Sequence, residues 1–185
     1  MEKIKIESGI LLISEPYLED PNFKRTVVLV VEHDENGTIG FVLNKKTELS
    51  LNDVIENIPR YSTNLYLGGP VEQNTLHFIH SSSLSIPGSI EIASGLNWGG
   101  DFDTLVDLIS VGKVEINEVR FFLGYSGWAK EQLSSEIDNK AWILSRYSTE
   151  SILNIDADEL WHHILNNMGD EFRLIANYPE NPQFN

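Results

Sequence analysis

The sequence predicts one α+β domain spanning residues 1–185, with a mixed, largely antiparallel sheet surrounded by helices. Three observations lead to this class. Hydrophobic residues make up 41% and charged residues 22% of the 185 positions, which is typical of a folded domain that buries a core. Strand-like and helix-like segments both occur, but they do not alternate as in a doubly wound βαβ series. The Asn36-Gly37 pair between two apolar runs is typical of a tight antiparallel hairpin.

Eight short apolar segments are predicted strands. The strongest covers residues 26–32, which are rich in β-branched side chains on both faces and therefore predict a central strand covered from both sides. Asn36-Gly37 should connect it to residues 38–43, with glycine supplying a positive φ. In chain order, the predicted strands are residues 9–13, 26–32, 38–43, 64–67, 76–80, 89–92, 119–125 and 141–145.

Four helices are predicted where apolar residues recur at helical spacing, three of them after a capping residue. They begin at Ser50, at Asp101 or Asp103, at Trp128 and at Asp156. The first carries its apolar residues over positions 51–58, and the third places Leu133 and Ile137 on one face. Gly112 and Gly169 should end the second and fourth helices.

Composition argues against several classes of protein. The chain has no cysteine, which excludes disulfides, thiol nucleophiles and cysteine-ligated zinc. Thirteen Lys and Arg residues against 28 Asp and Glu residues give a net charge of −15, so binding to nucleic acid is not expected. The longest aliphatic run, residues 27–31, is far shorter than the roughly 18 residues of a membrane span. We therefore predict a cytoplasmic protein that does not enter the membrane.

Two glycine-rich segments have the composition of functional motifs but not their full pattern. Gly124-Tyr125-Ser126-Gly127-Trp128 differs from the nucleophile elbow G-x-S-x-G because an indole replaces the last glycine, so we interpret it as a structural turn. Gly99-Gly100 lacks the strand-to-helix setting of a phosphate loop, and we interpret it as a tight turn as well.

The histidines do not form an evident metal or acid–base site. His77 and His80 are three positions apart on a predicted strand, which sends their rings to opposite faces. Glu32-His33-Asp34 concentrates polar groups at a strand end, but it is also an ordinary approach to a hairpin turn. We therefore expect neither a metal nor a cofactor, and we assign no catalytic residue.

The candidate ligand-binding residues are Asn22, Arg25, Asn44 and Trp128. Asn22 and Arg25 precede the most buried strand, and Asn44 follows the strand paired with it, so the three should meet at one end of the hairpin. An arginine there offers a planar fork to a carboxylate or phosphate group. The alternative is that Arg25 pairs with Asp20 or another acidic residue and only fixes the loop.

Seven segments in order resemble the AlgH-like family of bacterial proteins over essentially the whole chain. They are residues 9–14, 20–29, 32–34, 37–44, 67–71, 122–128 and the terminal Pro179, Pro182 and Asn185. The resemblance implies a cytosolic α+β domain with a bifurcated, partly barrel-like sheet. It also brings the label of transcriptional regulator, which comes from a genetic association with alginate production. It implies no reaction, cofactor or catalytic residue. Ser126 and Glu131 stand where alanine and glycine are usual in the family.

The sequence is compatible with three functions. The first is a non-catalytic binding or regulatory module, with an unidentified small molecule or protein as its partner. The second is an enzyme with a pocket near Arg25, Asn44 and the segment from Gly124 to Trp128. The third, a regulator that contacts DNA directly, conflicts with the net charge of −15.

Overall fold

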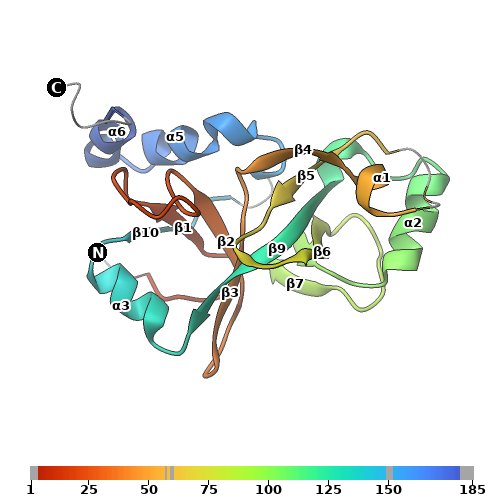
Figure 1. Cartoon of the computed structure of the whole chain (residues 1–185), viewed down its shortest axis with the longest axis horizontal. Coiled ribbons are helices and arrows are strands. Elements are labelled where there is room, and N and C mark those ends of the chain that lie inside the picture. The colour runs from red at the N-terminus through yellow and green to blue at the C-terminus, as the bar shows by residue number, and fades with distance from the viewer. Residues whose placement is uncertain (1–3, 57, 59–60, 149–151, 180–185) are drawn as a thin grey trace.

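The computed structural model describes residues 4–56, 58, 61–148 and 152–179, in which ten strands form one open sheet (Figure 1). The main strand order is β10-β1-β2-β3-β9-β6-β8-β7, while β5 pairs with β9 and β4 with β5. All pairings are antiparallel except β5 with β9. The predicted α+β class and the mixed, largely antiparallel sheet are confirmed.

The strands are β1 Leu11–Ser14, β2 Val27–His33, β3 Gly37–Val42, β4 Lys46–Ser50, β5 Asn64–Leu67, β6 Val71–Ser81, β7 Ile90–Ala93, β8 Leu96–Trp98, β9 Val119–Ala129 and β10 Trp142–Ser145. The helices are α1 Leu51–Val54, α2 Phe102–Ser110, α3 Gln132–Asp138, α5 Ala157–Asn167 and α6 Asp170–Ala176, with a short 3₁₀ turn, η1, at Ile116–Glu118.

The predicted hairpin is formed by β2 and β3, which pair antiparallel. At its tip, the Asp34 carboxylate accepts hydrogen bonds from the backbone N–H groups of Asn36 and Gly37. Gly37 has a φ of +152°, and a Cβ added there would lie 2.2 Å from the carbonyl oxygen of Trp128. Glycine is therefore required both by the turn and by the close approach of β9.

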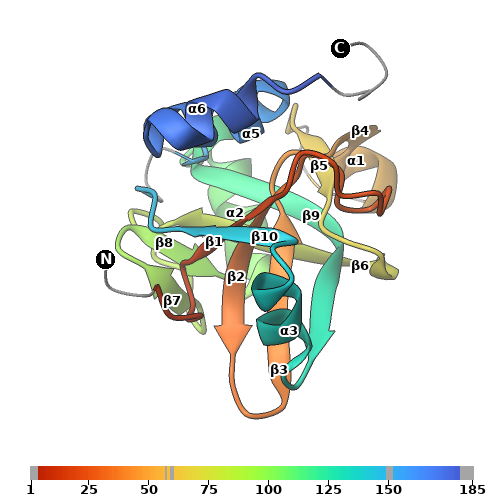
Figure 2. The same cartoon turned by 90° about the vertical axis from the view of Figure 1, so that its left-hand side faces the viewer.

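β2 is covered from both sides, as its sequence predicts. Val27, Leu29 and Val31 pack in one cluster with apolar residues of α5, whereas Val28 and Val30 pack in another with Leu133 of α3 and two tryptophans. Figures 1 and 2 both show β1 and β2 between the α5–α6 pair and α3. A third cluster lies under α1 and α2, on the part of the sheet that contains β5, β6 and the first half of β9.

The sheet divides along β9. One edge of this strand pairs with β6, and the other pairs first with β5 at Phe122 and Leu123 and then with β3 from Ser126 onward. Gly124, with φ +65°, lies where the partner changes. The predicted turn from Gly124 to Trp128 was wrong, because residues 126–129 pair with β3 and extend the strand. The following helix accordingly begins at Gln132 and not at Trp128.

Other helices and strands differ from the predicted ones where the local sequence signals were weak. α1 ends at Val54, since Ile55 adopts an extended conformation, so the predicted helix over 51–58 was too long. β4 and β8 were not predicted. β4 depends on a partner that is distant in sequence, and the pairing of β8 with β6 is short. α6 was also missed: Gly169 ends α5 as predicted, but a second helix follows at once.

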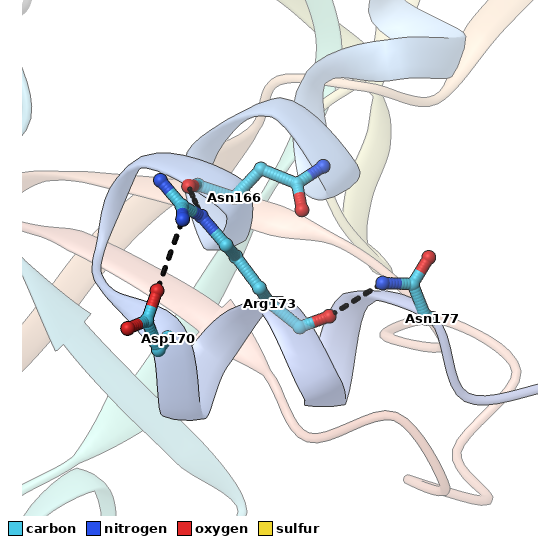
Figure 3. A network of polar contacts seen from close by, with 4 residues as sticks. All are labelled: Asn166, Asp170, Arg173 and Asn177. Carbon is cyan, nitrogen blue, oxygen red and sulfur yellow. Dashed lines mark hydrogen bonds and ion pairs between the residues drawn. The ribbon is translucent and has the colours of Figure 1, made fainter.

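The corner between α5 and α6 is held by Arg173. Its Nε donates to the carbonyl oxygen of Asn166 at 3.0 Å, and its Nη1 lies 2.9 Å from Asp170 Oδ1 (Figure 3). The Asn177 amide donates to the Arg173 carbonyl oxygen at the other end of α6. These contacts are exposed, so they fix the direction of the corner more than they stabilise the fold.

Candidate functional site

Asn44 and Arg25 do meet at one end of the hairpin, through backbone contacts. Asn44 Oδ1 accepts from the N–H of Val27 at 2.9 Å, and Asn44 Nδ2 donates to the carbonyl oxygen of Arg25 at 2.9 Å. Both polar atoms of the amide therefore hold the start of β2. Glu32, His33 and Asp34 lie at the opposite end of the hairpin.

The Arg25 side chain lies beneath the C-terminal helices. Its guanidinium stacks 4.9 Å from the ring centre of Trp161, Nη2 donates to the carbonyl oxygen of Tyr178, and Nη1 lies 3.4 Å from His162 Nε2. Arg25 adopts a φ of +49°, and its Nε is buried without a hydrogen-bond partner. Within the described part of the chain no carboxylate forms an ion pair with Arg25.

Asn22 and Trp128 do not join this pair. The Asn22 N–H donates to Asp20 Oδ1 at 2.8 Å and shapes the loop before β2. The Trp128 indole is buried, donates to Glu136 Oε2 at 2.9 Å and stacks on Phe23. Trp128 belongs to the cluster on the α3 side of the sheet, whereas Trp161 under Arg25 belongs to the other. The structure therefore places Arg25 and Trp128 on different faces.

The remaining polar residues of the sequence motifs are engaged in the fold. Ser126 is fully buried, and its hydroxyl donates to the Gly68 carbonyl oxygen at 3.0 Å. The buried His80 ring lies 2.9 Å from the Ser81 carbonyl oxygen and 2.9 Å from Ser89 Oγ. His33 Nδ1 lies 2.8 Å from Thr38 Oγ1. Among the described residues, no three His, Asp or Glu side chains are grouped as in a metal site.

A cleft of about 500 Å³ lies elsewhere, between β6, the β7–β8 pair and the start of α2. Its walls are mostly apolar and include three aromatic side chains. It is lined by Ile55, Leu76, His77, Phe78, Gly88, Ile90, Trp98, Gly99, Gly100 and Phe102. We call this the aromatic cleft. Apolar walls with few polar groups are typical of ligand sites.

His77 lines the cleft, and its hydrogen bonds define the tautomer of its ring. Its Nε2 lies 2.9 Å from Thr75 Oγ1, and the Thr75 hydroxyl donates its proton to the carbonyl oxygen of Glu72 at 2.8 Å. Thr75 must then accept from His77, which puts the ring proton on Nε2. Burial lowers the pKa of His77, which favours the neutral ring and leaves Nδ1 as a hydrogen-bond acceptor.

The aromatic cleft could not be predicted from the sequence because its walls come from separate segments. His77, Trp98 and Phe102 are brought together only by the pairing of β6 with β8 and the tight path of residues 99–101. The available signal was the glycine pair Gly99-Gly100 between two aromatic residues, since such glycines let a chain turn sharply beside a cavity.

A branched, open α+β sheet with helices on both faces and an apolar cleft beside one branch defines the structural class. The sequence profile of the AlgH-like family matches residues 11–173. The chain belongs to the AlgH-like family, and the resemblance seen in its sequence is confirmed.

Relatives cover almost the full chain. A UPF0301 protein of Cytophaga hutchinsonii is 41% identical over 181 residues, covering 97% of this chain and 100% of its own. One from Chlorobium limicola is 42% identical, covering 98% and 97%. The solution structure of the AlgH protein from Pseudomonas aeruginosa matches with a TM-score of 0.74 at 26% identity, covering 97% and 98%. A crystal structure of a Corynebacterium diphtheriae protein matches in fold, with a TM-score of 0.81 at 22% identity, covering 96% and 95%.

Within the described residues, no helix combines the length and the apolar character needed to cross a bilayer.

Proposed function

We propose that this protein is a cytoplasmic, non-catalytic binding module whose ligand occupies the aromatic cleft. The observation that carries the proposal is the gathering of Phe78, Trp98 and Phe102 around an open cavity of about 500 Å³. Aromatic walls of this kind contribute affinity because burying their surface is favourable in water. His77 at the cleft wall adds no buried charge, because burial lowers its pKa and favours the neutral ring.

A binding function is preferred to the enzyme alternative for a geometric reason. The Ser126 hydroxyl donates to a backbone carbonyl, both polar atoms of the Asn44 amide hold the backbone, and Arg25 lies on the other face from Trp128. A common reaction centre would require these groups to face one cavity. A role for Arg25 in ligand binding stays a prediction, for which its unpartnered Nε is the supporting observation.

A neutral aromatic fluorophore, N-phenyl-1-naphthylamine, tests the proposed site. We expect saturable binding with one site per chain, weakened at least fivefold by Phe102→Ala. Ile90→Ser should also weaken binding and should fold normally, because the Ile90 side chain is 56% exposed. Val111→Ala is the matched control, since Val111 is an exposed apolar residue just after α2 that does not line the cleft. Unchanged binding in both cleft variants would overturn the proposal.

A further inference from the structure

The aromatic cleft contains an open edge of the sheet. β6 runs from Val71 to Ser81, but β8 pairs with it only at Ile79, His80 and Ser81. Beyond Trp98 the chain leaves β6, because Gly99 and Gly100 adopt φ values of +65° and +109° and lead into α2. No described strand continues the line of β8 beside the preceding residues of β6.

Two hydrogen bonds show which backbone groups face this edge. In an antiparallel strand, the N–H and C=O of one residue point to the same side, and the side alternates along the strand. Gly99 N–H donates to the Phe78 carbonyl oxygen at 2.9 Å, so the groups of Phe78 face the β8 side. The backbone N–H and C=O of Leu76, two residues earlier, should point to the same side.

The partner strand supports the same assignment independently. Leu76 lies opposite Leu123 of β9, and the Leu123 carbonyl oxygen accepts from Gly68 N–H at 2.9 Å, on the side of β9 away from β6. Leu76 and Leu123 therefore form a non-hydrogen-bonded pair, and the N–H and C=O of Leu76 point away from β9. They point toward the aromatic cleft, which Leu76 lines.

We propose that the cleft binds an extended, basic segment of a partner protein, which adds a strand to the β6 edge at Leu76. This inference rests on the proposed function and names its ligand class. Backbone hydrogen bonds to Leu76 would hold the segment, and an apolar side chain opposite Leu76 would pack toward Phe102, on the face to which the Leu76 side chain points. The donor and acceptor of Leu76 specify a peptide backbone, which a purely apolar ligand would leave unsatisfied.

Acidic residues that neighbour the cleft residues in sequence favour a basic peptide. Glu56, Glu91, Asp101 and Asp103 are exposed, and each is next in sequence to a residue that lines the cleft. The Asp101 carboxylate also accepts hydrogen bonds from Thr104. The chain as a whole carries −15. Lysine or arginine side chains at alternate positions of a bound strand would lie near these carboxylates, while the intervening apolar side chains would face the cavity.

Fluorescence anisotropy with synthetic peptides of about eight residues, alternating lysine with valine or phenylalanine, tests the inference at about 0.15 M salt. We expect saturable binding by the alternating peptide. A peptide whose amides are N-methylated on the edge that faces β6 should bind at least tenfold more weakly. A peptide methylated on the opposite edge should keep its affinity. A glutamate version and a scrambled lysine version should also bind at least tenfold more weakly.

Two variants at one position separate backbone recognition from side-chain packing. Leu76→Pro removes the N–H that faces the cleft and no hydrogen bond to β9, so an edge position should tolerate it. Leu76→Ala shortens the side chain but keeps the N–H, and it is the matched control. We expect Leu76→Pro to bind the peptide at least tenfold more weakly than Leu76→Ala, with both variants folded by circular dichroism.

The outcomes distinguish this inference from the proposed function. Equal binding of the two N-methylated peptides, or of the scrambled peptide, would overturn strand addition. If the naphthylamine probe still binds in the cleft, the binding module stands and only its peptide ligand is refuted. If neither probe nor peptide binds, both proposals fail.

Discussion

Gly37 lies where the backbones of β3 and β9 come close together, and no side chain fits between them at this position. A Cβ at this position would be 2.2 Å from the Trp128 carbonyl oxygen of β9. We predict that Gly37→Val lowers the free energy of unfolding by about 1–3 kcal/mol, measured by urea denaturation. Glu35→Ala is the control, since Glu35 is exposed in the same turn and its loss should change stability by less than about 0.5 kcal/mol. An unchanged midpoint for Gly37→Val would contradict the observed approach of β9.

Glu131 presents the opposite case, a side chain where glycine is favoured. It precedes α3 with a φ of +64°, in the left-handed region that favours glycine. The left-handed conformation costs an ordinary residue about 1–2 kcal/mol, part of which glycine loses again in unfolded-chain entropy. Glu131→Gly should therefore stabilise the protein by about 0.5–1 kcal/mol, seen as a higher melting temperature. Lys130→Gly, one residue earlier at a negative φ, should not stabilise it.

At the scale of the element, one carboxylate of α3 accepts hydrogen bonds from two indoles of the sheet. Glu136 Oε2 accepts from the indole Nε1 of Trp128 at 2.9 Å and from that of Trp142 at 2.8 Å. Both tryptophans are buried, so losing the acceptor leaves two unpaired donors. We predict that Glu136→Ala costs about 2–4 kcal/mol in urea denaturation, and that Ser134→Ala on the exposed side of α3 costs less than about 0.5 kcal/mol.

A double-mutant cycle checks the cause of that loss. Trp142→Phe removes one of the two indole donors while keeping most of the ring. The cost of Glu136→Ala should be smaller in the Trp142→Phe background, with a coupling of about 0.5–3 kcal/mol. Strict additivity of the two changes would show that the carboxylate does not hold the helix through the indole.

At the scale of the whole molecule, two histidines make stability depend on pH. Burial lowers the pKa of both His77 and His80 below the usual 6.5. The unfolded chain therefore binds protons at a higher pH than the folded protein, so their contribution is complete above about pH 6.5 and is lost as pH falls through the lower folded-state pKa. We predict a smaller free energy of unfolding at pH 5.5 than at pH 7.5, measured at about 0.5 M salt to screen the net charge.

Titration followed by nuclear magnetic resonance checks, for each histidine separately, whether it causes this pH dependence. The ring protons of His77 and His80 should titrate below pH 6.5. A His77→Gln variant should show a weaker pH dependence of unfolding over the same range. Titration of both rings at or above pH 6.5 would refute this explanation.

The net charge of −15 determines a second property of the whole molecule. Duplex DNA binding requires clustered cations that displace condensed counterions. We predict no measurable binding to duplex DNA at about 0.15 M salt by fluorescence anisotropy. A sequence-selective complex with submicromolar affinity would contradict this and would favour the role of a direct transcriptional regulator.

The sequence by itself determined the features that depend on neighbouring residues. The periodicity and β-branching of residues 26–32 predicted a strand buried on both faces, and Asn36-Gly37 predicted its hairpin. Asp156 predicted the start of α5, and for α2 the sequence left Asp101 or Asp103 as the cap, of which the structure has Asp101. Such predictions are possible because a capping side chain bonds to N–H groups within its own first turn. From the hairpin alone it also followed that Arg25 and Asn44 lie together at one end.

Only the tertiary structure decided what depends on partners distant in sequence. The segment from Gly124 to Trp128 has turn-like composition, yet it is a strand because β3 supplies its hydrogen bonds. Arg25 lies under α5, and the aromatic cleft forms where β8 ends beside β6 and α2 begins. Capping and periodicity act within a few residues, whereas the edge of a strand is open or closed only according to which other strand reaches it. For that reason the fold class could be predicted from the sequence and the candidate site could not.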